Sequence, residues 1–451
     1  MKNKADIPKI HFIGVGGISM SALAKWCALT GYRVSGSDRN YSGILNDLGA
    51  LGIYTYVGIN EAVAASADTV VYTSAVSADN PELAAARRAG VKALERHVFL
   101  GEMQKAFDKV IAVSGTHGKT TVTALISAVF KKAEMSFTAH IGGEAADLNG
   151  NLYAAGKDFF VTEACEYRRN FLSLNPDCTV ILNIESDHPD CYGDIGELTD
   201  SFAEFVKNTR GGGIIVLNDN IAPENLHICK NKHMLTFGLN ESSYCRAENI
   251  SEHSGICEYD VYIKGEFFAR VRPRLAGRHN IFNALAAITV CSYYGVDKKS
   301  IVSALEHFGG VKRRFELVKR INGADIILDY AHHPSEIKAT LAAAKAVSKG
   351  EVKAYFQPHT YTRTDKYFDE FASCFTDADE ISLLPTYPAR ETADMGRTAF
   401  ELFYYINSNI REVSYFDNFL DAAANILKTA RPDDLVLILG AGDINEIINL
   451  I

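Results

Sequence analysis

The strongest chemical signal in this sequence is a glycine loop between a predicted strand and a predicted helix. The loop reads VSGTHGKTT over residues 113–121. Its glycines let backbone N–H groups turn toward phosphate oxygens, and the helix N-terminus adds a partial positive charge. Lys119 can reach the outer phosphates of a nucleotide, and Thr120 presents a hydroxyl to Mg²⁺. The predicted phosphate-binding residues are Gly115, Thr116, His117, Gly118, Lys119, Thr120 and Thr121.

The loop departs from the general pattern G-x-x-x-x-G-K-[ST], because Gly115 lies only three residues before Gly118. A plain turn is therefore the alternative interpretation of this segment. The strand–loop–helix context favours the phosphate site.

Acidic and histidine side chains follow the next two predicted strands. Glu163 ends the strand FFVTE, and Asp187 and His188 follow the strand that ends in ILN. The carboxyl ends of parallel strands open onto one crevice, so these side chains are expected to converge with Thr120. Oxygen ligands suit Mg²⁺, and a histidine is a tolerated neighbour. The alternatives are that Asp187 and Asp190 cap a helix and that His188 is structural.

A second glycine-rich turn, GVGGIS, lies near the N-terminus between a predicted strand and a predicted helix. It resembles a dinucleotide fingerprint in which Ser19 replaces the last glycine, and Asp38 ends the following strand. The pattern supports a diphosphate at this helix N-terminus and a ribose near Asp38. The substrate-binding residues predicted here are Gly14, Gly16, Gly17, Ile18, Ser19 and Asp38.

A third group of motifs is basic and amidic and lies at predicted strand exits and domain junctions, where clefts form. The segments are RHNIFN at 278–283, KRRF at 312–315, DYAHHP at 329–334, QPHTYTR at 357–363 and YPARE at 387–391. The adjacent histidines at 332 and 333 do not indicate zinc, because no further His/Cys set has suitable spacing.

The elements that must position these residues alternate between strands and helices, which indicates parallel sheets. Strands are predicted at 9–15, 33–37, 69–74, 109–113, 159–162, 179–183, 214–217, 324–330, 352–356, 380–385 and 434–439, with a β-rich stretch over 234–274. Helices are predicted at 19–31, 61–65, 121–131, 277–290, 334–346 and 369–374.

The predicted fold class is α/β in three domains. They are a Rossmann-like domain over 1–105, a P-loop ATPase-like domain over 106–314 and a Rossmann-like domain over 315–451. A chain of 451 residues agrees with this division at roughly 150 residues per domain.

Composition excludes several classes of protein. With 47% apolar and 22% charged residues, the chain is neither disordered nor a collagen or coiled-coil rod. No uncharged apolar stretch reaches about 18 residues, so no membrane span is expected. The N-terminal residues are too polar for a signal peptide. A formal charge of 46 − 55 = −9 argues against broad nucleic-acid binding.

The nine cysteines are odd in number and lack CxxC spacing, which excludes a disulfide scaffold and a zinc ribbon. Reduced thiols in a cytoplasmic protein are expected. Packing roles are expected even for Cys165 and Cys191, which lie near the predicted site.

The motifs together resemble the Mur ligase family, which builds the peptide of bacterial peptidoglycan. The matching blocks occur in family order along essentially the whole chain: GVGGISMSALA, GTHGKTT, NIESDHPD, GRHNIFNALAA, GVKRRFE, DYAHHPSE, FQPHTYTRT, YPARE and GAGDI. FQPHTYTRT and YPARE favour the member that adds the first amino acid over the member that recycles murein tripeptide.

The resemblance implies that the first domain binds the UDP of the substrate, the second hydrolyses ATP, and the third closes over both. It implies ATP-driven joining of L-alanine to the carboxylate of UDP-N-acetylmuramate, through an acyl phosphate. It also implies a role for each matching residue. Lys119 binds phosphate, Thr120 and Glu163 hold Mg²⁺, and His188 holds a second metal. Asn280 and Asn283 meet the nucleotide base, and Arg314 and Asp329 form a clamp near the hinge. His359, Arg363 and Arg390 face the substrate.

Two departures from the family pattern stand out. The segment CEYRR at 165–169 replaces an acidic stretch that many members carry, and Ser19 replaces a glycine at the UDP phosphates. The absence of lysine from 193–205 agrees with the first enzyme of the series, because later members use a modified lysine there.

Two other functions stay open on sequence grounds, a nicotinamide oxidoreductase built on Gly14–Ser19 and a non-catalytic nucleotide switch. The sequence also leaves open the preference among alanine, serine and glycine and the identity of the base that deprotonates the amine. It does not decide whether the protein is a monomer or a dimer. No nucleic-acid or membrane partner is expected.

Overall fold

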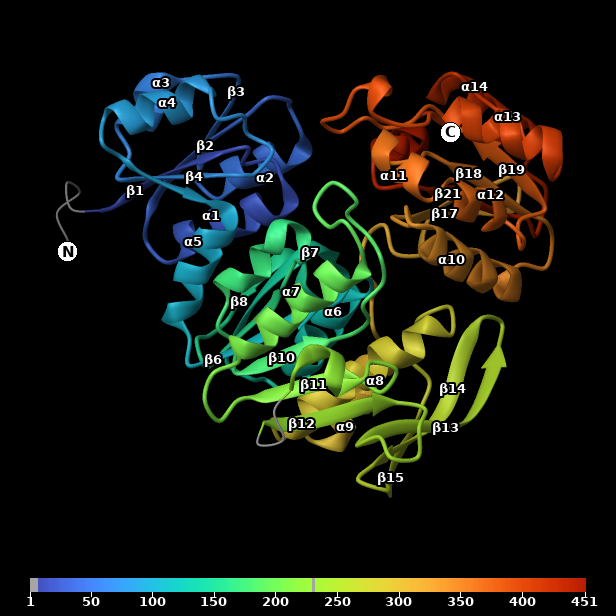
Figure 1. The fold of residues 1–451 in the computed structure, drawn as a ribbon, viewed down its shortest axis with the longest axis horizontal. Coiled ribbons are helices and arrows are strands. Elements are labelled where there is room, and N and C mark those ends of the chain that lie inside the picture. The colour runs from blue at the N-terminus through green and yellow to red at the C-terminus, as the bar shows by residue number, and fades with distance from the viewer. Residues whose placement is uncertain (1–6, 229–231) are drawn as a thin grey trace.

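The computed structural model describes residues 7–228 and 232–451. The chain forms three lobes, each built on its own sheet (Figure 1). The N-terminal lobe (blue) and the C-terminal lobe (orange to red) flank the central lobe (cyan to yellow). The predicted three-domain α/β fold is confirmed.

The N-terminal sheet is entirely parallel, in the order β3-β2-β1-β4-β5. Each of its first four strands is followed by a helix, which is the connection that parallel pairing requires. Its strands are β1 (Lys9–Ile13), β2 (Arg33–Asp38), β3 (Tyr54–Val57), β4 (Thr69–Tyr72) and β5 (Lys92–Glu95). Its helices are α1 (Ile18–Leu29), α2 (Gly43–Ala50), α3 (Glu61–Ala65), α4 (Pro81–Arg88) and α5 (Arg96–Met103), with a 3₁₀ turn η1 (Gln104–Ala106).

The central sheet has ten strands in the order β15-β14-β13-β12-β11-β10-β6-β9-β7-β8, parallel in the middle and antiparallel at both edges. Its strands are β6 (Lys109–Ser114), β7 (Phe137–Ala145), β8 (Gly150–Ala154), β9 (Phe159–Glu163), β10 (Cys178–Ile181), β11 (Ile214–Asn218), β12 (His233–Gly238), β13 (Cys245–His253), β14 (Ile256–Ile263) and β15 (Glu266–Val271). Its helices are α6 (Lys119–Lys132), α7 (Ile195–Lys207), α8 (His279–Tyr293) and α9 (Lys298–Glu306), with 3₁₀ segments η2 (Ala146–Leu148), η3 (Tyr167–Ser173) and η4 (Pro223–Leu226).

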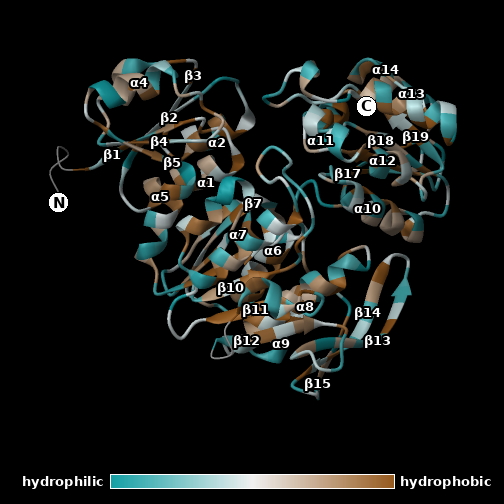
Figure 2. Ribbon diagram, in the orientation of Figure 1, coloured by the Kyte–Doolittle hydropathy of each residue, from teal (hydrophilic) through white to brown (hydrophobic). Residues whose placement is uncertain are grey.

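The middle strands of this sheet are buried along their length because helices cover both faces. β10 and β11 are fully buried and mostly hydrophobic (Figure 2). α6 and α8 pack on one face, and α7 packs on the other. This layering holds the carboxyl ends of β6, β9 and β10 in fixed register, so the residues that follow them share one edge.

The C-terminal sheet has the order β16-β17-β21-β18-β19-β20 and is parallel except for the β16–β17 pair. Its strands are β16 (Glu316–Ile321), β17 (Ala324–Asp329), β18 (Val352–Phe356), β19 (Glu380–Leu383), β20 (Ser414–Tyr415) and β21 (Leu435–Leu439). Its helices are α10 (Pro334–Val347), α11 (Tyr361–Lys366), α12 (Phe368–Ser373), α13 (Ala399–Asn409) and α14 (Phe419–Thr429), with 3₁₀ segments η5 (Ala393–Met395) and η6 (Ile444–Asn449).

Every strand and helix predicted from the sequence has a counterpart in the structure. Several elements had no prediction, among them the β7–β8 hairpin and the edge strand β16. β16 has no fully buried residue, so its pattern lacks the apolar run that marks an interior strand.

Within the described residues, no helix is both long enough and apolar enough to cross a lipid bilayer. The eight described cysteines are free thiols, and Cys229 lies outside the described residues.

Candidate functional site

The predicted phosphate loop joins the buried strand β6 to α6, as its sequence indicates. Gly115 and Gly118 have φ values of +138° and +85°, which side chains rarely adopt. A Cβ on Gly118 would also lie 2.6 Å from Oδ1 of Asn283. Asn183, just after β10, fixes the loop: its Oδ1 accepts from the backbone N–H of His117 at 2.8 Å, and its Nδ2 donates to the His117 carbonyl at 3.1 Å.

The ammonium of Lys119 lies inside this loop. It donates to the carbonyls of Gly115 and Thr116, and it lies 2.9 Å from Oε2 of Glu166. Burial alone would lower the pKa of Lys119, but the Glu166 carboxylate and other nearby acidic groups together outweigh burial and raise the pKa above its ordinary value. The lysine is therefore held as a cation.

Glu163, at the end of β9, accepts the backbone N–H of Gly142 at 2.6 Å. A Cβ on Gly142 would lie 2.7 Å from Oε2 of Glu163, so a side chain there would displace the carboxylate from this position. Burial raises the pKa of Glu163, and hydrogen bonds and the Lys119 charge offset part of that rise. His188 has φ = +55°, and its Nε2 lies 3.2 Å from Oε1 of Glu166.

These side chains line one cavity of about 820 Å³. The cavity brings together the predicted residues Lys119, Thr120, Glu163 and His188, which come from the ends of three neighbouring strands of the sheet. Ile18 of the N-terminal domain and His332 of the C-terminal domain also line it. All three domains therefore contribute to its wall.

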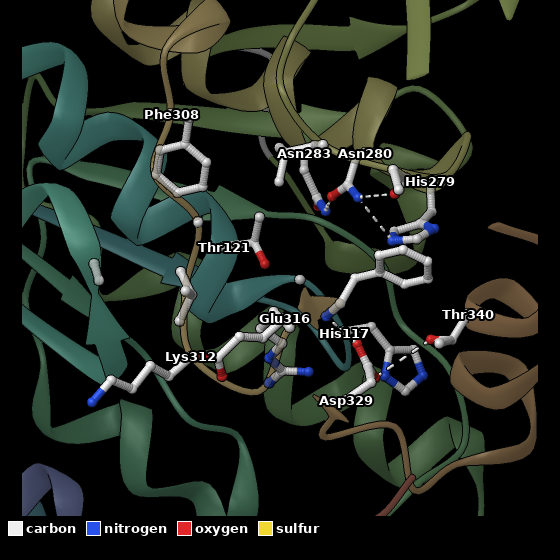
Figure 3. A pocket seen from close by; sticks show the side chains of 18 of the residues that line it. His117, Thr121, His279, Asn280, Asn283, Phe308, Lys312, Glu316, Asp329 and Thr340 are labelled. Carbon is white, nitrogen blue, oxygen red and sulfur yellow. Dashed lines mark hydrogen bonds between the residues drawn. The ribbon is translucent and has the colours of Figure 1, made fainter. Parts of the chain in front are cut away.

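A second cavity of about 960 Å³ adjoins the first and shares His117, Gly118 and Arg314 with it. Asn280 and Asn283 lie on its wall at the start of α8, and Figure 3 shows them with His117 and Asp329 around the space. The two asparagines are joined by a hydrogen bond of 2.8 Å from Nδ2 of Asn283 to Oδ1 of Asn280.

Asp329 and Arg314 lie where the chain passes from the central to the C-terminal domain. The Asp329 carboxylate accepts the backbone N–H groups of Phe315 at 2.7 Å and Ala331 at 2.8 Å. The Arg314 guanidinium lies 5.0 Å from the ring centre of Tyr330. Asp329 thus fixes the hinge, while Arg314 faces both cavities.

The C-terminal domain docks on the central domain through a buried ion pair. Arg363 of α11 donates from Nε at 3.1 Å and from Nη2 at 2.9 Å to Oδ1 of Asp187. Its Nη1 lies 3.1 Å from Nδ1 of His359. Burial, and then the charges of neighbouring cationic groups, lowers the pKa of His359 to about 3, so this ring is neutral. Arg363 and His359 line neither cavity.

Arg390 contacts both other domains. It donates to the Tyr167 hydroxyl of the central domain at 2.5 Å and to the carbonyl of Ser74 in the N-terminal domain at 3.5 Å. It lines neither of the two cavities either.

The N-terminal glycine turn is shaped by Asp38, whose Oδ2 accepts the backbone N–H of Gly16 at 2.8 Å. Gly14 has φ = +84°, and Gly17 caps α1. The Ser19 hydroxyl does not face the open turn: it lies 2.8 Å from Nε2 of His140 in β7. Ser19, which stands where the family pattern has glycine, therefore makes a contact between the N-terminal and central domains.

Sequence reasoning missed Glu166, His140 and Glu336. Glu166 belongs to the segment that departs from the family pattern, and that departure was its only signal. His140 belongs to no motif that predicts chemistry, and Glu336, the last residue of the matching block DYAHHPSE, has no predicted role. Glu336 lies in α10, and its Oε1 lies 2.9 Å from Nδ1 of His117, across the domain junction.

Three potential metal ligands that are far apart along the chain meet at this junction. His117, Glu185 and His333 each offer a potential ligand atom, and these atoms lie within 4.8 Å of one another. The Ser335 hydroxyl already contacts Nε2 of His117 at 3.2 Å and Nδ1 of His333 at 2.8 Å. Hydrogen bonding therefore accounts for the cluster.

Three family models match consecutive parts of the chain. They describe the catalytic domain of the Mur ligase family over residues 9–108, the Mur ligase middle domain over 113–291, and the glutamate ligase domain of Mur ligases over 313–442.

Curated relatives and solved structures match along almost the full length. A UDP-N-acetylmuramate–L-alanine ligase from Caldicellulosiruptor bescii is 40% identical over 445 residues, covering 98% of both chains. Its namesake from Acetivibrio thermocellus is 41% identical, covering 97% of this chain and 94% of the relative. The crystal structure of a UDP-N-acetylmuramate–alanine ligase from Thermotoga maritima superposes with a TM-score of 0.83 at 28% identity, covering 98% of each chain.

A murein peptide ligase from Psychrobacter arcticus also matches, with a TM-score of 0.76 at 25% identity and 98% of each chain covered. Since relatives at 40% identity cover nearly all of this sequence, and the same three domains recur in the solved structures, the chain belongs to the Mur ligase family.

Proposed function

We propose that this protein is an ATP-dependent ligase that joins L-alanine to the carboxylate of UDP-N-acetylmuramate in peptidoglycan precursor synthesis. The observation that carries the proposal is the shared cavity, in which Lys119, Thr120, Glu163 and His188 meet residues of both other domains. The names of the relatives at about 40% identity support the same reaction.

The three domains divide the work in this proposal. Residues 1–105 hold the UDP part of the substrate at Gly14–Ser19 and Asp38. Residues 106–314 hold ATP, with its phosphates at Gly115–Thr121 and its base near Asn280 and Asn283. Residues 315–451 close the site. Arg314 and Asp329 act at the hinge. His359, Arg363 and Arg390, predicted to face the substrate, line neither cavity, and Arg363 and Arg390 join this domain to the other two.

Mg²⁺ fits the residues present. The Glu163 carboxylate is partly buried and close to the Thr120 hydroxyl, and hard oxygen donors of this kind are what Mg²⁺ prefers. His188 would hold a second ion. When bound, the metal offsets negative charge on the phosphates.

The reaction must activate a carboxylate, which is a poor acyl donor at neutral pH. The substrate carboxylate attacks the γ-phosphorus of ATP, ADP leaves, and an acyl phosphate forms. The alanine amine then attacks the acyl carbon, loses a proton to a base, and expels phosphate. Lys119 offsets charge on the transferred group, and closure of the C-terminal domain excludes water that would hydrolyse the acyl phosphate.

Phosphate release in the presence of UDP-N-acetylmuramate tests this proposal. Release is expected to require ATP, Mg²⁺ and an amino acid, with L-alanine preferred over serine and glycine. Release that needs no amino acid, or that responds only to a murein tripeptide, would overturn it. We place the reaction in the cytoplasm, in keeping with the free thiols.

The murein tripeptide ligase remains the nearest alternative, because the Psychrobacter arcticus structure shares the whole fold. The relatives at about 40% identity do not favour it. The nicotinamide oxidoreductase explains only the N-terminal glycines and leaves the phosphate loop without a role.

A further inference from the structure

Glu166 is the most deeply buried carboxylate in contact with the phosphate loop. Its side chain is 1% exposed, and both of its oxygens face Lys119, at 3.0 Å from Oε1 and 2.9 Å from Oε2. Oε1 also lies 3.2 Å from Nε2 of His188. One carboxylate thus joins the lysine proposed to bind phosphate to the histidine proposed to hold metal.

Lys119 is fully satisfied in this arrangement. An ammonium group has three donors, and here they meet two loop carbonyls and the Glu166 carboxylate. A phosphate that approaches Lys119 therefore finds its charge already neutralised. Binding must replace the carboxylate by a phosphate oxygen.

We infer that Glu166 is a resident counter-ion of Lys119, which nucleotide phosphates must displace and which makes nucleotide binding depend on a divalent cation. The inference rests on the ATP-binding role proposed above. Glu166 is a positioning residue here, because it acts through Lys119 and His188.

The dependence on a cation follows from charge. Once Lys119 turns to the phosphates, Glu166 remains buried beside them, and Glu163 lines the same cavity. Like charges brought together at low dielectric repel strongly. A polyphosphate without a divalent cation therefore meets uncompensated carboxylates, Glu166 and Glu163 among them, whereas a complexed polyphosphate brings its own compensating charge. The contact between Oε1 of Glu166 and Nε2 of His188 also orients His188 after Lys119 has turned to the phosphates, as carboxylates beside ligating histidines do.

A purely structural role for Glu166 makes a different prediction. In that case neutralising the carboxylate would lower stability but would leave the ratio of nucleotide affinities with and without cation unchanged. The two roles are therefore separated by binding measurements that do not involve turnover.

The experiment measures the dissociation constant of ADP from the whole protein by titration calorimetry, once in Mg²⁺ and once in EDTA. The variant is Glu166→Gln. The matched control is Glu144→Gln, which removes a carboxylate that lines the same cavity and pairs with Lys312 instead of Lys119. In wild type, the dissociation constant in EDTA is expected to exceed that in Mg²⁺ by a large factor. In Glu166→Gln this ratio is expected to fall at least tenfold, through tighter binding in EDTA, while the control stays within about threefold of wild type.

A ratio in Glu166→Gln within twofold of wild type would overturn the inference. If Glu166→Gln does not fold, two other variants take its place. One is Glu166→Asp, and the other is the charge-neutral double variant that combines Lys119→Met with Glu166→Gln. The aspartate is expected to keep the cation dependence, and the double variant is expected to lose it; the opposite result overturns the inference. Failure of the wild-type protein to bind ADP in Mg²⁺ would count against the proposed function instead.

Discussion

The hydroxyl of Ser19 lies 2.8 Å from Nε2 of His140, across the junction of the N-terminal and central domains. Arg96 donates to the same hydroxyl at 3.2 Å, and Nδ1 of His140 lies 3.0 Å from the Thr162 hydroxyl. His140 is 2% exposed, so both ring nitrogens depend on these partners for hydrogen bonds. The chain Arg96–Ser19–His140–Thr162 therefore ties the first turn of α1 to the strand that approaches Glu163.

Removing the Ser19 hydroxyl is expected to destabilise the protein. In Ser19→Ala, Nε2 of His140 loses its partner, and an unsatisfied buried polar group costs about 1–3 kcal/mol. Urea unfolding measures this loss. The control is Ser66→Ala in the same domain, where the exposed hydroxyl contacts only the carbonyl of Val63. A loss in Ser19→Ala no larger than in Ser66→Ala would show that the contact carries no stability.

His140 is expected to make the protein less stable in acid. Burial, and then the charge of Arg96, lowers its pKa from 6.5 to about 3 in the folded state. Between these values the unfolded chain binds the proton and the folded chain does not. Stability is therefore full above about pH 6.5 and falls as pH drops, by up to about 1.4 kcal/mol per unit.

The variant His140→Gln isolates this effect, since its amide can still bond to Ser19 and Thr162. Unfolding free energies of both proteins at several pH values between about 5 and 7 give the two slopes. The slope of unfolding free energy against pH is expected to be smaller in the variant, by an amount that corresponds to about one bound proton. Other buried histidines, such as His332, contribute equally to both curves. Parallel curves would rule out titration of His140 in this range.

The pair formed by Lys119 and Glu166 predicts a double-mutant cycle. Lys119→Ala is expected to fold, to lose ATP-dependent ligation by about 100-fold or more, and to lose about 3–5 kcal/mol of stability because Glu166 is left charged and buried. Adding Glu166→Gln is expected to restore much of the stability and none of the ligation. Near-normal turnover of Lys119→Ala would contradict the phosphate-loop assignment, and additive stability losses would contradict the pairing.

Much of the site was predictable because its signals are local. Lys119 and Thr120 belong to a continuous loop, and Glu163 and His188 each follow a predicted strand. Parallel pairing then brings strand ends to one edge without further information. The order of the strands in the sheet places β9, β6 and β10 side by side, as that argument requires.

The contacts that join the domains were not predictable in the same way. Ser19 and His140 are 121 positions apart, and Arg363 and Asp187 are 176 apart. Periodicity and turn chemistry act over a few residues and carry no information on which domain faces meet. Glu166 was missed for a related reason: its role depends on the folding of Lys119 back toward β9, which no pattern in the sequence specifies.

The buried pair between Asp187 and Arg363 is expected to hold the C-terminal domain against the central domain. In Asp187→Asn the guanidinium of Arg363 stays buried with no charged partner, and breaking such a pair costs about 3–5 kcal/mol. Undocking returns the arginine to water. Small-angle scattering is therefore expected to give a larger radius of gyration, and ligation is expected to fall because closure becomes less favourable.

Asp194→Asn is the matched control, because Asp194 lies seven residues away, is exposed, and accepts the backbone N–H of Glu197 within its own domain. Its radius of gyration is expected to equal that of wild type. An unchanged radius in Asp187→Asn would mean that other junction contacts, such as His117 with Glu336, hold the domains together. Burial raises the pKa of Asp187, but the charge of Arg363, the neighbouring histidines and a backbone hydrogen bond together outweigh burial and hold the pKa well below its usual range. The docked form is therefore expected to persist in wild type through mildly acidic pH, where the variant is already open.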